Sequence, residues 1–395
     1  MQFDFDMRID RKHTDCIAAD GWKSLFAGQE ITLPCPEDQL IPMWIADMSF
    51  ATPAFILDAI RRRLDRQILG YTRPADSTYF DTFSAWTDLL YGWHWEPEDL
   101  FFSNGIVSAL NELARLLCGP GDKILFQTPA YGPFLGAVKT CGAEPLFSRL
   151  VLQDGVWRTD LEDFARKAAD PAVKLCLLCS PHNPTGRVWK REELLAVGQI
   201  CVDNGLIVVS DEIHCDILRA GMQHIPLVSL FPDYKKIITC MAPSKTFNMA
   251  GMQFSNVLIR DPELRSRWSK VRGQVVNPLS LAAATGAYAH GYDWLVAMRR
   301  YLDGNYAALQ AVLRARLPEL TFRIPEGTYL AWIDLRPYLP PDADPVRFFA
   351  ERAGVLLEAG RMFVDNADGF IRLNLACPRS VMTEAAERIC SALGH

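Results

Sequence analysis

Short hydrophobic runs alternate with helix-length segments through the middle of the chain. The runs are nearly continuous in apolar residues rather than alternating between apolar and polar positions. This pattern is typical of strands whose two faces are both covered. It predicts strands over Lys123–Gln127, Lys174–Cys179, Leu206–Ser210, Ile237–Met241 and Ser255–Ile259.

Two of the intervening segments have the spacing of amphipathic helices. One is predicted over Ile106–Cys118, before Gly119-Pro120-Gly121, and the other over Lys190–Asn204, before Gly205. Because strand, helix and strand follow one another, we predict an α/β fold. Its large domain should contain a mostly parallel sheet covered by helices on both faces.

The pattern changes beyond about residue 287, where a long helix, three strands and a last helix predict a smaller α+β domain. These elements are predicted over Trp294–Leu317, Leu320–Ile324, Tyr329–Leu335, Phe370–Ala376 and Val381–Leu393. We therefore expect a large domain (49–286), a small C-terminal domain (287–395) and an N-terminal segment (1–48) that packs on the small domain.

Composition and charge narrow the possible functions. Lys and Arg number 41 against 47 Asp and Glu, and the resulting net charge of −6 over 395 residues argues against nucleic-acid binding. No apolar run approaches about 18 residues, so no membrane-spanning helix is expected. The 11 cysteines are scattered and no signal-peptide pattern opens the sequence, which predicts reduced thiols in the cytoplasm.

Cys176 and Cys179 form a C-x-x-C spacing, with His182 nearby. The pair lies inside a predicted strand rather than at the start of a helix, where a redox thiolate would be activated. No second pair of this spacing completes a zinc site. We interpret both cysteines as core residues and expect no metal.

Four short polar stretches carry the candidate chemistry, namely Ser103–Val107, Ser180–Gly186, Ser210–His214 and Ala242–Asn248. The last three each follow a predicted strand, and open α/β sheets bind ligands at the carboxyl ends of their strands. The first opens a helix with Ser, Asn and Gly, whose free backbone N–H groups suit a phosphate. Each stretch is weak evidence by itself, but all four in this order are not expected by chance.

Together these stretches resemble the fold-type I pyridoxal-phosphate (PLP) enzymes of the aminotransferase class I/II superfamily, over essentially the whole chain. The branch most similar to this sequence is the MalY/PatB-type cystathionine β-lyase, or C–S lyase, family. The stretches that carry this closer resemblance are Pro42–Met48, Asp211–His214, Ala242–Gly251 and Phe370–Arg379.

The resemblance implies PLP as the cofactor and assigns residues to it. Lys245 matches the lysine that holds the cofactor as a Schiff base and then acts as a general base. Asp211 matches the carboxylate that pairs with the pyridine nitrogen. Asn183 matches the side chain that hydrogen-bonds the phenolic oxygen, and Tyr131 matches the aromatic that stacks on the ring. His214 either contacts the region of the phenolic oxygen or merely packs.

The resemblance also implies where the phosphate lies. Its donors would be the backbone N–H groups of Gly105, Ile106 and Val107 and the hydroxyl of Ser244. Tyr71 resembles the tyrosine that reaches the phosphate of the neighbouring subunit, which implies a homodimer with sites at the interface. A packed aromatic side chain is the alternative interpretation of Tyr71.

On the substrate side, Arg372 matches the arginine that grips the α-carboxylate. A planar guanidinium suits that group because it makes two parallel hydrogen bonds. Asn183 is assigned to the substrate as well as to the cofactor. Trp44, Ala46 and Asp47 are expected to line the substrate entrance.

Several positions depart from the patterns of these enzymes. Where many aminotransferases have a serine, an arginine and a tyrosine, this chain has Ala242, Gln253 and His214, as the lyase branch does. The stretch Phe363–Asn366 lacks the glycines expected of the lyase family, and this difference bears on the shape of the substrate pocket.

The function implied is α,β-elimination from cystathionine or another S-substituted L-cysteine, which yields a thiol, pyruvate and ammonia. Two alternatives stay open, an aminotransferase that uses the same cofactor and a regulatory binding protein that keeps the fold. No side chain in the sequence identifies the thioether substrate.

Overall fold

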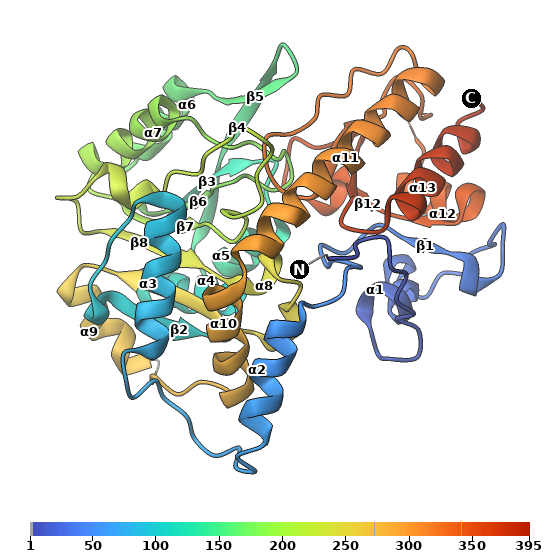
Figure 1. The fold of residues 1–395 in the computed structure, drawn as a ribbon. Helices are drawn as coiled ribbons and strands as arrows, with labels where there is room; N and C mark the ends of the chain where they lie inside the picture. Colours follow the sequence, from blue (N-terminus) through green and yellow to red (C-terminus); the bar gives the residue numbers. More distant parts are fainter. Residues whose placement is uncertain (1–2, 272, 341) are drawn as a thin grey trace.

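The structure is a computed structural model that describes residues 3–271, 273–340 and 342–395. An eight-stranded sheet and its helices form the larger part of the molecule, and a smaller sheet with α11, α12 and α13 lies beside it (Figure 1). No helix of the described residues is long and apolar enough to cross a membrane.

Most neighbouring strands of the large sheet run parallel, which confirms the predicted fold class. In spatial order the strands are β2 (Leu100–Ser103), β9 (Ser255–Ile259), β8 (Ile237–Met241), β7 (Ile207–Asp211), β6 (Val173–Cys179), β3 (Lys123–Thr128), β4 (Glu144–Gln153) and β5 (Val156–Thr159). β9 runs antiparallel to β8 and β2, and β5 runs antiparallel to β4. The segment from β8 to β9 holds only short helical turns rather than a crossover helix, which explains why β9 is reversed.

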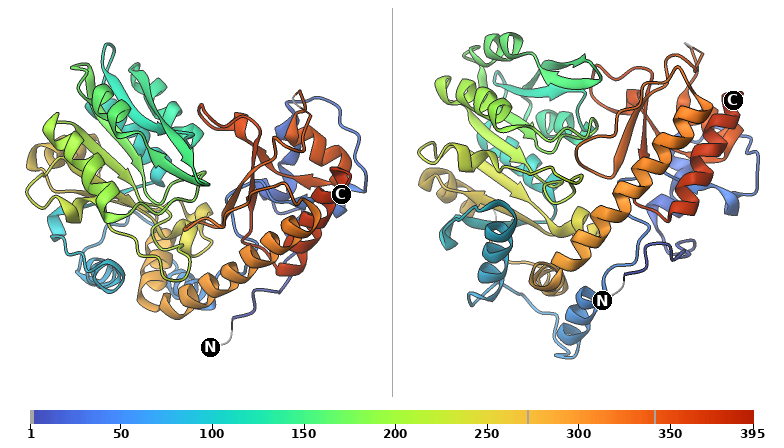
Figure 2. Two further views of the ribbon diagram at one scale, coloured as in Figure 1. Left: turned by 90° about the horizontal axis from the view of Figure 1, so that it is seen from above. Right: turned by 45° about the horizontal axis from the view of Figure 1, so that its top comes forward.

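Helices cover both faces of this sheet (Figure 2). Successive strand residues point to opposite faces, so Leu125 of β3 packs in one core cluster while Ile124 and Phe126 pack in the other. In the same way Cys176 and Cys179 are buried on opposite sides of β6. One cluster includes α4 (Ile106–Leu117), α5 (Gly132–Cys141) and α9 (Pro262–Val271).

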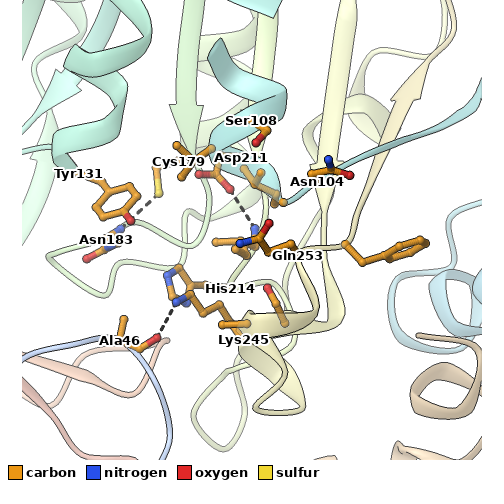
Figure 3. Close-up of a pocket in the computed structure, with 17 residues that line it drawn as sticks. Ala46, Asn104, Ser108, Tyr131, Cys179, Asn183, Asp211, His214, Lys245 and Gln253 are labelled. Atoms are coloured by element: carbon orange, nitrogen blue, oxygen red, sulfur yellow. Dashed lines mark hydrogen bonds between the residues drawn. The ribbon is translucent and has the colours of Figure 1, made fainter. Parts of the chain in front are cut away.

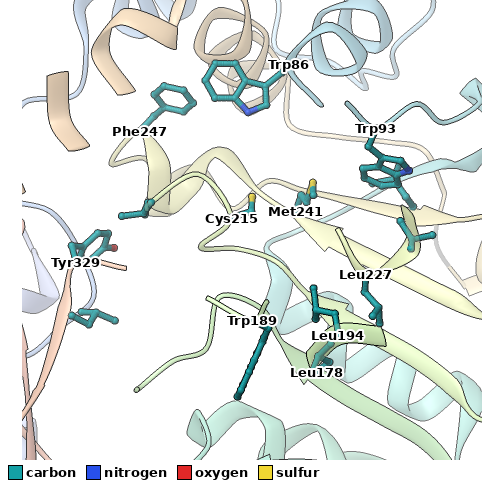
Figure 4. Packing of buried hydrophobic residues seen from close by; sticks show 14 of the residues in the cluster. Trp86, Trp93, Leu178, Trp189, Leu194, Cys215, Leu227, Met241, Phe247 and Tyr329 are labelled. Atoms are coloured by element: carbon teal, nitrogen blue, oxygen red, sulfur yellow. The ribbon is translucent and has the colours of Figure 1, made fainter. Parts of the chain in front are cut away.

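The other cluster contains most of the large aromatic side chains (Figure 4). Trp86 lies against Phe247 there, with ring centroids 5.5 Å apart. The helices that contribute to it include α2 (Ala54–Leu64), α3 (Thr78–Tyr91), α6 (Leu161–Ala168), α7 (Arg191–Asp203) and α10 (Pro278–His290). The two helices of the large part that the sequence predicts correspond to α4 and α7. Each begins and ends within one residue of its predicted bounds.

The smaller part has its own core. Its antiparallel sheet has the order β10 (Leu330–Asp334), β13 (Phe370–Asn374) and β12 (Glu358–Ala359), with α12 (Pro345–Ala353) and α13 (Arg379–Ala392) beside it. The strand predicted over Leu320–Ile324 is absent. Leu320 and Phe322 are buried in the core of the smaller part, but the segment pairs with no strand and stays irregular.

The N-terminal region lies against the smaller part (Figures 1 and 2). It holds the one-turn helix α1 (Ile17–Asp20) and β1 (Ile41–Pro42), which pairs parallel with β11 (Val355–Leu356). Trp22 and Trp44 pack against Val346 of α12. The exact domain boundaries stay a prediction, and the one predicted at residue 286 falls inside α10.

The 25-residue helix α11 (Tyr292–Arg316) connects the two parts. Trp294 and Leu302 at its beginning pack in the aromatic cluster of the large part, whereas Leu309 and Leu313 pack in the core of the smaller part. The same helix therefore holds the two cores at a fixed distance.

We predict that Leu302→Ala lowers the free energy of unfolding by about 2–5 kcal/mol, because the side chain is fully buried and its removal leaves a cavity. Leu89→Ala is the matched control, since Leu89 is 61% exposed and its truncation should change stability by less than about 0.5 kcal/mol. Chemical denaturation of the two variants measures the difference. Equal losses in both would contradict the role given to α11.

Candidate active site

A cavity of about 320 Å³ lies at the carboxyl ends of the central strands (Figure 3). All four polar stretches of the sequence contribute to its wall. Gly105 follows β2, Asn183 follows β6, Asp211 ends β7 and Lys245 follows β8. The topology of the sheet thus brings together residues that lie up to 140 positions apart, because parallel strands end at one edge.

Lys245 extends into this cavity from α8 (Pro243–Thr246), which begins directly after β8. Its Nζ donates a hydrogen bond to the backbone carbonyl of Ala46, 2.5 Å away. Burial lowers the pKa of Lys245 to about 8, and the positive charge of Arg372 lowers it too, while Asp47 acts in the opposite direction. A substantial fraction of this amine is therefore neutral near pH 8 and able to act as nucleophile and base.

Asp211 is buried at the end of β7, where it accepts a hydrogen bond from the backbone N–H of Ile213 at 3.2 Å. Burial raises the pKa of Asp211 to about 7, and the neighbouring Glu212 raises it further. The carboxylate forms no ion pair with any residue that the structure describes. A bound cationic group would stabilise its charged form.

A phosphate-sized cradle lies at the start of α4. Gly105 has φ +85°, a left-handed conformation that glycine adopts without strain, and the helix begins at Ile106. The first backbone N–H groups of a helix have no partner within it, and the residues that carry them here, Ile106 and Val107, line the cavity. Ser108 and Ser244 add hydroxyl groups to the same wall. The sequence did not single out Ser108, although it stands one turn into the predicted helix.

Arg372 lies on β13 and its side chain is 3% exposed. One of its terminal nitrogens donates to Asn183 Oδ1 at 2.9 Å, and the other contacts the carbonyl of Trp44 at 3.4 Å. That second nitrogen also forms an ion pair with Glu358 of β12. The structure therefore brings Arg372 and Asn183 into direct contact, while their assignment to the substrate stays a prediction.

Tyr131 and His214 also line the cavity. Burial raises the pKa of Tyr131 above its ordinary value, so its phenol stays neutral. Burial lowers the pKa of His214 to about 3, and the charges of Lys245 and Arg372 add to the effect. His214 is therefore neutral, and its Nδ1 has no hydrogen-bond partner among the described residues, which leaves it free for a ligand.

The three residues expected at the substrate entrance differ in their positions. Ala46 lines the cavity and places its carbonyl against Lys245. Asp47 forms an ion pair with Arg11. The indole of Trp44 points away, because it packs in the N-terminal cluster and donates to the carbonyl of Ala18 at 3.0 Å. Only its backbone carbonyl reaches the site.

Tyr71 lies far out on the surface and is 100% exposed. It belongs to the segment between α2 and α3, where Ile68 and Leu69 are also exposed, at 69% and 60%. Within one chain this tyrosine does not line the cavity. Any contact with a phosphate would have to be made in a second copy.

The family model for aminotransferase class I and II matches residues 45–389. This chain belongs to that family. Cystathionine β-lyase PatB of Bacillus subtilis is 36% identical to it, over 98% of this chain and 99% of the relative. Protein MalY of Escherichia coli is 30% identical, over 99% of each chain.

Among solved structures, the PLP-bound C–S lyase from Staphylococcus hominis, complexed with the inhibitor L-cycloserine, superposes with a TM-score of 0.95. The two chains are 44% identical, and the superposition covers 100% of this chain and 98% of the other. The fold and the PLP-enzyme resemblance predicted from the sequence are thereby confirmed.

For a member of this aminotransferase family, the cavity fits PLP. A buried carboxylate without a cationic partner, Asp211, stands at one side, where the pyridine nitrogen needs a negative charge. The N–H donors at the start of α4 lie at another side of the cavity, where a phosphate fits. Lys245 supplies the amine within the same cavity.

The stretch Phe363–Asn366 lacks the glycines expected of this family, and the structure shows what replaces them. Asp365 and Asn366 both adopt φ +53°, and Asp and Asn tolerate this left-handed conformation better than other side chains. Asp365 also accepts two hydrogen bonds from Arg149, at 2.8 and 2.9 Å. The turn keeps its shape without glycine, and Phe363 places its ring 4.9 Å from the guanidinium of Arg372.

Glu358 is the main site residue that the sequence analysis missed. A signal was present, because this single charge interrupts the apolar run Val355–Ala359. An isolated charge in such a run is rarely buried without a partner. Tyr329 was also missed. Its hydroxyl donates to the carbonyl of Ala46 at 3.0 Å, beside the amine of Lys245.

We predict that apoprotein carrying Lys245→Met is more stable than wild-type apoprotein at pH 7. A lysine whose pKa falls from 10.5 to about 8 on folding destabilises the folded state in full below pH 8. This penalty of about 1–3 kcal/mol fades as the pH rises towards 10.5. The melting temperature should therefore rise by a few degrees at pH 7, with the gain lost near pH 10.

Lys139→Met is the control, because Lys139 is exposed at the end of α5 and should show no such gain. Thermal unfolding at both pH values measures the effect. A Lys245→Met variant with the same melting temperature as the wild type at pH 7 would contradict the burial of this amine.

Proposed function

We propose that this protein is a PLP-dependent C–S β-lyase that cleaves cystathionine or a related S-substituted L-cysteine to a thiol, pyruvate and ammonia. The observation that carries the proposal is the position of Lys245, whose amine shares one cavity with the carboxylate of Asp211, which forms no ion pair with any described residue. The similarity to PatB, a cystathionine β-lyase, over nearly the whole chain supports the lyase rather than the aminotransferase assignment.

PLP, when bound, supplies a ring that accepts the electron pair left behind when the Cα–H bond of the substrate breaks. Lys245 takes that proton on Nζ, for which a pKa near 8 suits it. Asp211 would supply the negative charge that pairs with the pyridine nitrogen, and Tyr131 would stack on the ring. The elimination then releases the thiol from Cβ, and water completes the conversion to pyruvate and ammonia.

Arg372 and Asn183 orient the substrate in this proposal. Arg372 binds the α-carboxylate, and Asn183 holds one of its terminal nitrogens in place. Orientation matters because the Cα–H bond must point towards Lys245 for the proton to be transferred. Gly105, Ile106, Val107 and Ser244 hold the phosphate, so that the ring and its lysine cannot drift apart.

We predict that the purified holoenzyme releases pyruvate and ammonia from L-cystathionine without any 2-oxo-acid acceptor. Lys245→Ala should lower this rate by about 10²–10⁴-fold, because the proton acceptor is lost. Lys139→Ala, a change at an exposed lysine, should keep the wild-type rate. Coupling pyruvate release to lactate dehydrogenase provides the measurement. Turnover that requires an added 2-oxo acid would identify an aminotransferase instead.

We further propose that the enzyme is a homodimer in which Tyr71 completes the phosphate site of the other subunit. Two features support this arrangement. Tyr71 stands fully exposed beside the apolar Ile68 and Leu69, which a second copy would cover. Among the described residues that line the cavity, only Lys245 is cationic, so a donor from a partner would add to the backbone N–H groups and the Ser244 hydroxyl assigned to the phosphate.

The free state of all 11 cysteines supports a reducing compartment such as the cytoplasm.

We predict that Tyr71→Phe weakens PLP binding by about tenfold to a hundredfold, the loss expected when one hydrogen bond to a charged group is removed. Release of PLP on dilution, followed by its absorbance, measures the change. Tyr292→Phe is the control, because Tyr292 is also exposed on the surface. Sedimentation should show a dimer for all three proteins. A monomer, or unchanged PLP binding in Tyr71→Phe, would refute the shared site.

A further inference from the structure

Glu358 and Arg372 face each other across two paired strands. The register of β12 and β13 sets these two residues opposite one another, so their side chains leave the sheet on the same face. Glu358 is 16% exposed and its carboxylate contacts the terminal nitrogen of Arg372. The strand pairing, rather than a flexible loop, thus fixes a carboxylate beside this guanidinium.

Both terminal nitrogens of Arg372 have partners in this state, whereas its buried Nε has none among the described residues. One terminal nitrogen donates to Asn183, and the other contacts Glu358 and the carbonyl of Trp44. An arginine binds a carboxylate best through two parallel N–H donors. A substrate carboxylate that binds through the two terminal nitrogens therefore meets Glu358 at one of them.

On the basis of the function proposed above, we propose that Glu358 occupies the substrate-carboxylate position on Arg372, and that substrate binding displaces it from the guanidinium with uptake of a proton. Glu358 is then a positioning and selectivity residue. It keeps Arg372 oriented while the site is free, and it makes the binding of a carboxylate depend on pH.

The charges around Glu358 give the sign of this effect. Arg372 from β13, Lys245 from α8 and Tyr131 from the segment before α5 are the titratable groups that face it. Burial raises the pKa of Glu358, whereas the charges of Arg372 and Lys245 lower it. A second carboxylate on Arg372 takes away much of this stabilising positive charge, and two carboxylates that share one site raise the pKa of one of them. Binding should therefore protonate Glu358, and affinity should fall as the pH rises.

Propionate is a suitable probe, because it offers a carboxylate without an amine and undergoes no elimination. Calorimetric titration of the holoenzyme in buffers of different ionisation enthalpy measures both its affinity and the protons taken up. We expect wild-type enzyme near pH 7.5 to take up as much as one proton more per site than Glu358→Gln. Across the pH range in which uptake occurs, the affinity of the wild type should fall by up to about tenfold per pH unit relative to that variant.

The matched control is Glu319→Gln, the same change at an exposed residue of the smaller part, which should behave as wild type. Proton uptake linked to Lys245 is present in both proteins and cancels in the difference. Equal uptake and equal pH dependence in wild type and Glu358→Gln would overturn the proposal. If Glu358→Gln does not fold, the wild type decides, since binding without any proton uptake is incompatible with displacement.

Arg372→Ala separates this proposal from the lyase function. Loss of propionate binding in Arg372→Ala places the probe on the guanidinium, as the proposal requires. Undiminished binding would overturn the role of Glu358 together with the assignment of Arg372. Pyruvate release from cystathionine by the wild type is measured independently, and that result alone tests the lyase function.

Discussion

The amine of Lys245 lies in a cavity that removes much of its hydration, and an ammonium group in such a place is unfavourable unless charge or hydrogen bonds compensate it. The protein keeps the amine there by anchoring the short helix that carries it. Thr246, the next residue, donates to the buried carboxylate of Asp216 at 2.7 Å, and Trp86 of α3 donates to the same group. The packing behind Lys245 therefore helps to hold its amine in the cavity, where burial lowers its pKa.

The cavity needs both parts of the molecule. Asp211 and Lys245 come from the large part and Ala46 from the N-terminal segment, whereas Arg372, from the smaller sheet, bonds to the lining residue Asn183. Helix α11 is packed into both cores, so a displacement of one part relative to the other must disturb one of them. Close-packed cores resist such displacement, and this rigidity keeps the guanidinium of Arg372 within reach of Asn183.

The sequence predicts those features of this structure whose signal lies in residues close together along the chain. The strands Ile237–Met241 and Ser255–Ile259 were predicted to the residue, because a strand buried on both faces coincides with a nearly continuous apolar run. The order of the four polar stretches along the strands likewise predicted that they meet at one edge of the sheet, whereas the role of each residue was inferred from the family resemblance. The strand over Leu320–Ile324 was wrong, since apolar residues report burial but not the partner that a strand needs. Glu358 was missed because its importance comes from its register with Arg372, which only the pairing of β12 with β13 reveals.

The charges around the cavity explain why that pairing matters for function. Lys245 and Arg372 are basic, while Asp211 and Glu358 are acidic, so the four groups are close to balanced among themselves. A cationic ring that pairs with Asp211 leaves Glu358 to compensate Arg372, and a substrate carboxylate then arrives at a guanidinium that is already neutralised. Two carboxylates cannot both remain ionised on one guanidinium in a poorly solvated site without a large electrostatic cost. The pair of Glu358 and Arg372 thus has two effects: it favours a ligand with a carboxylate, and it disfavours an excess of negative charge.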